Sequence, residues 1–200
     1  MEKLKNRIDK SITDEILIAQ FQGGDVDSFE ELVLRYKDQL LNFVYRFVGN
    51  RSDSEDIVQE TFLRVFKNKH YYKEIAKFST WVYTIAGNLA KTELRRRKRK
   101  KLLSVSSIIK DDKDYDIPDL AASPEKEVDG IIKENIIQSA IEKLPSRFRE
   151  VIVLRDIQGF AYEEISQILD IPLGTVKSRV NRGRLKLQED LGNVFDISVN

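Results

Sequence analysis

The sequence predicts an all-α protein with two small helical domains, an N-terminal helical bundle and a C-terminal four-helix domain with a helix-turn-helix, joined by an acidic flexible linker. On both sides of the linker, apolar residues recur at three- and four-residue spacing, which is the period of an amphipathic helix. The linker itself has no sustained period, is acidic and contains Pro118 and Pro124. The expected division of the chain is 1–101, 102–127, 128–192 and a tail at 193–200.

Composition excludes several classes of function. The 200 residues include no cysteine, so disulfides, a thiol nucleophile and a zinc–thiolate site are not expected. The only histidine, His70, has no histidine or cysteine companion, so neither a metal nor a cofactor is expected. No run approaches the ~18 apolar residues that cross a bilayer, and the N-terminus lacks an apolar signal core. The expected location is therefore the cytoplasm.

The first two helices are bounded by recognisable signals. Thr13 can cap the first helix, and Gly23–Gly24 can end it. Asp27 and Glu30 have the spacing of a capping pair for the second helix, which Gly49 ends. The apolar stripe of the second helix consists of Phe29, Leu32, Val33, Tyr36, Leu40, Phe43, Val44 and Phe47.

A third helix is predicted to start at a capping box, Ser52 to Glu55. Its inward residues are expected to be Ile57, Val58, Thr61, Phe62, Val65 and Phe66. Its outer face carries Asp53, Asp56, Gln59 and Glu60, and no cation occurs between Ser52 and Leu63. Interaction with the helix dipole explains acids in the first turn but fades before Glu60. The pattern therefore favours a protein-binding face, with a purely stabilising role as the alternative.

The fourth helix is expected to start at Ser79 or Thr80 and to run to about Arg99. Trp81, Ile85 and Leu89 are predicted to pack inward, and Tyr83, Asn88, Thr92 and the basic run that follows to face outward. The helix ends in a dense basic run, with eight cations and one carboxylate between Lys91 and Lys101. An aromatic and amide face that leads into cations suits single-stranded nucleic acid. The alternatives are a core tryptophan at position 81 and a solvated basic tail.

The acidic linker contrasts with this basic run. Eight acids and two cations lie between Asp111 and Asp129. Such segregated charge is typical of a nucleic-acid surface beside an acidic connector. Beyond it, a helix is expected from near Val128 to the break at Pro145, and another at 148–157, stopped by Gly159. The C-terminal domain then has about 60 residues, a size that is marginal for independent stability.

The last two helices form a predicted helix-turn-helix in AYEEISQILDIPLGTVKSRVNRGRLKL, residues 161–187. On a wheel of ~100° per residue, the second helix has a stripe for burial formed by Val176, Val180, Gly183 and Leu187. The opposite face carries Lys177, Ser178, Asn181 and Arg182, which can donate hydrogen bonds to bases or phosphates in a major groove. A solvated basic helix face is the alternative.

Three segments together resemble the extracytoplasmic-function (ECF) group of bacterial RNA polymerase sigma factors, in the sigma-70 family. DSEDIVQETFLRVF (53–66) is similar to the segment that docks on the clamp helices of the polymerase's largest subunit. FSTWVYTIAGNLAKTELRRRKR (78–99) resembles the element that opens and holds the promoter −10 region. The segment 144–187 resembles the domain that reads the −35 element. The resemblance covers nearly everything from Asp14 to Leu191.

The resemblance implies roles for individual residues. The polymerase contacts fall on the outward acidic face, at Asp53, Asp56, Gln59 and Glu60. The −10 contacts fall on Asn88, which would engage an unstacked base, and on Lys91, Thr92, Arg95 and Arg96. The −35 contacts fall on Thr175, Lys177, Ser178, Asn181 and Arg182. The helical wheel had already selected Lys177, Ser178, Asn181 and Arg182 without the resemblance.

The implied function is that of a sigma factor, which is not an enzyme. Its expected partners are core RNA polymerase, through the clamp helices and the flap region, promoter DNA and an anti-sigma factor. No membrane insertion is expected, and the free chain is expected to be a monomer.

Two other functions are possible from the residues. A stand-alone helix-turn-helix regulator would bind duplex DNA as a dimer, and it would need neither the basic-aromatic N-terminal helix nor the acidic face. A nuclease would need a metal cluster of carboxylates. The carboxylates here lie in capping positions and on an outward face instead.

Overall fold

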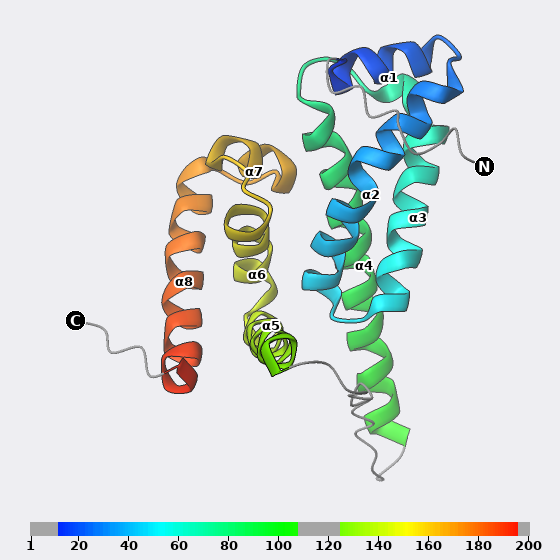
Figure 1. Cartoon of the computed structure of the whole chain (residues 1–200). Coiled ribbons are helices and arrows are strands. Elements are labelled where there is room, and N and C mark those ends of the chain that lie inside the picture. Colours follow the sequence, from blue (N-terminus) through cyan, green and yellow to red (C-terminus); the bar gives the residue numbers. More distant parts are fainter. Residues whose placement is uncertain (1–11, 108–124, 196–200) are drawn as a thin grey trace.

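The computed structural model describes the backbone of residues 12–107 and 125–195, and the side chains of 12–100 and 134–192. Every regular element in these ranges is helical, which confirms the all-α prediction (Figure 1). The N-terminal bundle consists of α1 (Asp14–Gln22), α2 (Val26–Val48), α3 (Arg51–Lys67), the short 3-10 helix η1 (Lys69–Tyr71) and α4 (Phe78–Ser107). The C-terminal domain consists of α5 (Glu125–Lys143), α6 (Ser146–Ile152), η2 (Val153–Ile157), α7 (Tyr162–Leu169) and α8 (Leu173–Phe195).

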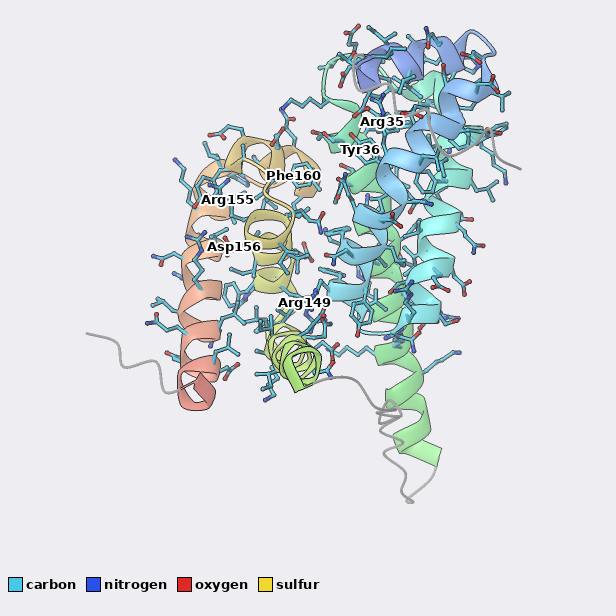
Figure 2. The ribbon with its side chains drawn as sticks, in the orientation of Figure 1. Arg35, Tyr36, Arg149, Arg155, Asp156 and Phe160 are labelled. Atoms are coloured by element: carbon cyan, nitrogen blue, oxygen red, sulfur yellow. The ribbon has the colours of Figure 1, made fainter. Side chains whose placement is uncertain are left out.

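The apolar stripe of α2 forms the centre of the N-terminal bundle. Its buried members are Leu32, Tyr36, Leu40, Phe43, Val44 and Phe47, as the spacing predicted. Each large apolar side chain contributes about 1.5–3 kcal/mol on burial. The Asp14 carboxylate ties α1 to α2, because it accepts hydrogen bonds from the Tyr36 hydroxyl at 2.5 Å and from the Arg35 guanidinium at 2.8 Å (Figure 2).

The N-caps of α2 and α3 were predicted wrongly. The N-cap of α2 is Asp25, whose carboxylate accepts the backbone N–H of Asp27 at 3.1 Å. The N-cap of α3 is Asn50, whose side-chain oxygen accepts the N–H of Asp53 at 2.9 Å. In each case a polar side chain two residues earlier already satisfies a free N–H of the first turn, so Asp27 and Ser52 lie inside their helices.

The fourth helix also departs from the prediction. It begins at Phe78, so Ser79 and Thr80 lie inside the helix and do not cap it. It also continues past Arg99 to Ser107, so the first residues assigned to the linker are helical. Tyr83, predicted to face outward, is only 1% exposed, and Phe66 of α3, predicted to face inward, is 45% exposed. The single tryptophan, Trp81, is half-buried and packs its ring on Tyr72 and Phe78 rather than facing solvent.

The outer ends of α5 and α8 differ from the predicted helix ends. α5 begins at Glu125 rather than near Val128, and α8 continues past Gly192 to Phe195. The rest of the predicted linker, residues 108–124, lies outside the described residues.

The helix predicted at 148–157 changes its hydrogen-bonding pattern midway. After the α-helical turns of α6, η2 is a π-helix, and the Gln158 N–H reaches back five residues to the Val153 carbonyl at 2.9 Å. Gly159 then ends it with a left-handed φ of 78°. The two bundles are in contact, since α4 lies against α7 and α2 lies against α5 and η2.

Candidate nucleic-acid interface

The turn between α7 and α8 has the geometry of a helix-turn-helix. Asp170 takes the left-handed conformation (φ 52°), and the Ile171 N–H closes the end of α7 on the Ser166 carbonyl at 3.1 Å. The Ser166 hydroxyl in turn donates a hydrogen bond to the Ile171 carbonyl at 2.6 Å. At the start of α7, Ala161 has no side-chain acceptor, but the Glu164 carboxylate accepts the Ala161 N–H at 2.9 Å.

The buried side of α8 is the stripe that the wheel predicted. Val176, Val180 and Gly183 are buried, and Leu187 is half-buried. Gly183 lies directly against α6, because a Cβ there would come within 2.7 Å of Ile152 Cγ1. This close approach fixes which side of α8 faces solvent.

The opposite side of α8 presents Lys177, Ser178, Asn181 and Arg182, all exposed, with Thr175 half-buried in the first turn. Among the described residues, neither Lys177 nor Arg182 takes part in an ion pair. Arg184 differs, because its guanidinium contacts the Asp156 carboxylate at 2.5 and 3.1 Å. Lys177 and Arg182 are therefore available to a ligand, whereas Arg184 holds α8 against η2.

The acidic face of α3 opens onto a groove shared with α4. Asp56 and Gln59 are exposed, and Asp53 and Glu60 are half-buried. Glu60 accepts a hydrogen bond from Arg64 at 2.8 Å. The groove has a volume of about 230 Å³ and is lined by Asp53, Asp56, Ile57, Glu60, Leu89, Thr92, Glu93 and Arg96. Four carboxylates around a partly apolar floor, with one arginine, suit a basic partner surface.

The predicted −10 residues differ in how accessible they are. Asn88, Thr92, Arg95 and Arg96 are exposed on α4, and the Thr92 hydroxyl donates to the Asn88 carbonyl at 2.8 Å. Lys91 is half-buried, and its ammonium lies 3.2 Å from the Glu150 carboxylate of α6. Arg96 binds Glu93 through two nitrogens at 2.7 and 3.0 Å, which lowers the pKa of Glu93.

Two features of α4 contradict the predicted surface. Tyr83 cannot stack on a base in this conformation, because its ring is enclosed. Arg97, expected to face out with the basic run, donates to the Val48 carbonyl at 2.8 Å and contacts the Asp53 and Glu93 carboxylates.

The sequence reasoning did not identify Glu93 or Glu150 as partners of the basic residues. The spacing of Glu93 to Arg96 and Arg97, three and four residues, could have indicated the first set. Nothing local indicates Glu150, because it lies 59 positions from Lys91 in the chain and meets it only through tertiary packing.

Across the described ranges, no group of three or more histidine, cysteine or acidic side chains could hold a metal ion. None of the helices described is both long enough and apolar enough to cross a membrane.

Two family models match the chain, one in each helical domain. The model described as Sigma-70 region 2 matches residues 32–100, and the model described as Sigma-70, region 4 matches residues 134–187. The first includes the acidic face of α3 and the predicted −10 residues of α4. The second ends at Leu187 and includes the whole helix-turn-helix.

Known relatives agree with these matches. ECF RNA polymerase sigma factor SigW of Bacillus subtilis is 38% identical over 185 residues, which cover 87% of this chain and 94% of SigW. Among solved structures, the sigma factor RpoE of Bartonella quintana, in complex with the anti-sigma factor NepR, aligns with a TM-score of 0.65 at 25% identity, covering 86% of this chain and 98% of RpoE. CnrH, in complex with the cytosolic domain of CnrY, has the same fold, with a TM-score of 0.66 at 23% identity over 93% of this chain and 99% of CnrH.

Proposed function

Because this chain belongs to the ECF group of RNA polymerase sigma factors, in the sigma-70 family, we propose that it binds core RNA polymerase and directs it to promoters by reading −35 duplex and melted −10 DNA. The observation that carries this proposal is the difference between the two sides of α8. One side is locked against α6 at Gly183, and the other presents Lys177, Asn181 and Arg182 to solvent. A helix in this setting fits the major groove. Residues 128–192 would therefore be the −35 domain and 1–101 the −10 domain, connected by 102–127.

In the −35 domain, Lys177, Ser178, Asn181 and Arg182 would contact bases or backbone, and Thr175 a phosphate. In the −10 domain, Asn88 would hold an unstacked base, with Lys91, Thr92, Arg95 and Arg96 along the strand. Extruding a base costs a few kcal/mol, and contacts to the captured strand offset this cost. The exposed amide of Asn88, one turn from Thr92, supports this assignment.

Core polymerase would bind the acidic face of α3 at Asp53, Asp56, Gln59 and Glu60. The groove beside it supports a partner with basic side chains, such as the clamp helices of the largest subunit. The C-terminal domain would contact the flap region. The phosphodiester chemistry belongs to the polymerase, and this chain acts as a monomer in the cytoplasm until it binds.

An anti-sigma factor is the proposed regulator. The related RpoE of Bartonella quintana was solved with the anti-sigma factor NepR, and its fold covers most of this chain. A partner of this class would hold the chain away from core polymerase until a signal releases it.

Run-off transcription tests the proposal. The purified chain is combined with sigma-free bacterial core polymerase and a pool of promoter fragments from the source organism. Discrete transcripts that require the chain are expected, and alignment of their upstream sequences gives the −35 and −10 elements. If no transcript appears, and the chain binds duplex DNA tightly without polymerase, it is a stand-alone regulator instead.

Replacing Arg182 with alanine is expected to weaken −35 duplex binding by about 1–3 kcal/mol and to relax the preference at one base position. Arg182→Lys is the matched control, because it keeps the charge but loses the planar fork that binds a guanine edge. Binding is measured by fluorescence anisotropy on −35 duplexes that differ at single positions, at several salt concentrations. A changed salt slope with unchanged base preference would reassign Arg182 to a phosphate.

A further inference from the structure

One cation of α8 is held by an acid from another element. α8 carries five cations, and no carboxylate lies between the first and the last of them in the sequence. The fold instead brings Asp156 of η2 against Arg184, whose Nε and one terminal nitrogen lie 3.1 and 2.5 Å from the two carboxylate oxygens. Figure 2 shows Asp156 on the part of the C-terminal domain that lies beside α8. Among the described side chains, the other four cations form no ion pair; they are Lys177, Arg179, Arg182 and Lys186.

This pair adds little to the stability of the domain. The side chains of Arg184 and Asp156 are 53% and 32% exposed, and exposed ion pairs contribute little because water screens them. α8 is already fixed on α6 at Gly183, where even a Cβ would clash with Ile152. Two parallel hydrogen bonds do, however, fix the direction of a guanidinium. The main effect of Asp156 is therefore on where the charge of Arg184 lies.

Arg184 lies on the same line of α8 as Lys177. It follows Lys177 by about two turns, and at ~100° per residue the directions of the two side chains differ by only ~20°. In a helix that enters the major groove, the residues near the N-terminus contact the bases. A long cation two turns further along the same line is within reach of the phosphates beside the groove. Arg184 is thus placed to bind the DNA backbone unless another group holds it.

We propose that Asp156 is a specificity-determining residue, which withholds Arg184 from the DNA backbone so that α8 binds duplex mainly through its sequence-reading side chains. The inference rests on the proposed function, in which Lys177, Asn181 and Arg182 read the −35 duplex. Asp156 lies in the π-helical turn η2, and such turns occur frequently at functional sites. The turn thus supplies the carboxylate that the cationic part of α8 lacks.

A free Arg184 would favour unrelated DNA over a promoter. Phosphate contacts supply nearly all of the affinity for unrelated duplex, and they carry no sequence information. On a −35 element, base contacts fix the position of α8, so Arg184 can use only a phosphate that lies within its reach in that position. On unrelated duplex, the domain is free to shift until Arg184 meets one. Because unrelated sites far outnumber promoters, this difference lowers the fraction of the protein at promoters.

A double-mutant cycle in the full chain tests the proposal. Asp156→Asn, Arg184→Gln and the double variant are compared with the wild type by fluorescence anisotropy on a labelled mixed-sequence duplex, from about 50 to 200 mM salt. Asp156→Asn is expected to bind at least about three-fold tighter at the lowest salt, with a log–log salt slope steeper by about 0.9, which corresponds to one more phosphate contact. Arg184→Gln and the double variant should keep the wild-type slope, because Arg184 contacts no phosphate in the wild type.

Two further variants separate this effect from a general change in charge. Glu163→Gln removes one exposed acid of the same domain, and Asp156→Glu keeps the carboxylate, so both should keep the wild-type slope. A shallower slope for Arg184→Gln would show that Arg184 already binds a phosphate in the wild type, which overturns the proposal. It is also overturned by an unchanged slope for Asp156→Asn, or by a gain that persists in the double variant.

The role in specificity is measured as a ratio of affinities. A −35 duplex obtained by run-off transcription is compared with the mixed-sequence duplex, and Asp156→Asn is expected to lower the ratio at least about two-fold. An equal gain on both duplexes would overturn this role. The salt slopes need no promoter sequence, so a failure of the proposed function would be seen separately, in the wild-type transcription assay.

Discussion

Replacing Asp56 and Glu60 together with lysine is expected to lower the affinity for core RNA polymerase at least about 30-fold, because two attractive charges at the proposed interface become repulsive. Both residues line the groove between α3 and α4. The Glu60→Lys change would also place a second cation beside Arg64, whose guanidinium now lies 2.8 Å from the Glu60 carboxylate. The α3 helix itself should persist, since its buried residues are untouched and the only acid of its first turn, Asp53, is kept.

The measurement is a titration of labelled protein with core polymerase, accompanied by circular dichroism. A matched control is Glu30→Lys with Asp38→Lys, two exposed positions on α2 that change the net charge by the same amount. The control should bind like the wild type. If the two double variants bind equally well, the acidic face of α3 is not the docking site.

Replacing Gly183 with valine is expected to unfold the helix-turn-helix domain. A Cβ at Gly183 would lie 2.7 Å from Ile152 Cγ1 and 3.0 Å from Ile152 Cδ1, and valine adds two methyl groups beyond it. Overpacking of this kind costs about 1–3 kcal/mol or more. A domain of about 60 residues has only a few kcal/mol of stability, so the loss is a large part of the total.

Gly174 provides the control on the same helix. No atom lies within 4 Å of a Cβ placed there, so Gly174→Ala is expected to be neutral or to stabilise α8 by up to about 1 kcal/mol. Thermal unfolding and −35 duplex binding are measured for each variant. Adding Ile152→Ala to Gly183→Val should recover part of the lost stability, since it removes the clashing atoms. Wild-type stability of Gly183→Val alone would show that α6 and α8 do not pack as described.

The patterns read from the sequence predicted what depends on local spacing. The α8 stripe of Val176, Val180 and Gly183 followed from helical period alone, because burial on one side of a helix depends only on the direction of each residue. The helix-turn-helix itself was predicted within a residue, since Asp170 and Pro172 have few alternative conformations. The outward direction of Lys177, Asn181 and Arg182 followed from the same wheel.

Features that depend on tertiary contacts were predicted wrongly or missed. Tyr83 packs on Phe43 of its own bundle and on Phe160 of the other domain, so its burial depends on tertiary contacts that local spacing does not indicate. Arg97 belongs to a dense basic run, yet the end of α2 and the start of α3 supply its acceptors. The predicted starts of α2 and α3 were wrong for a different reason. Several adjacent polar residues could have served as the N-cap of each helix, and only the three-dimensional geometry selects one of them.

The π-helical turn η2 adds one residue to its helix without changing the direction of the residues beyond it. Each residue of an α-helix advances the side-chain direction by about 100°, and a π-turn accommodates one extra residue within a continuous helix. Gln158 and Phe160, which meet Tyr83, come directly after this turn, and Asp156, which holds Arg184, lies within it. Deleting one residue from Val153–Ile157 would therefore let the helix relax to α geometry while Gln158 and Phe160 keep their directions, so that only contacts made within the turn, such as that of Asp156 with Arg184, would change. A single deletion within η2 is therefore expected to be tolerated better than one in α6, which would rotate the following residues of the helix by about 100°.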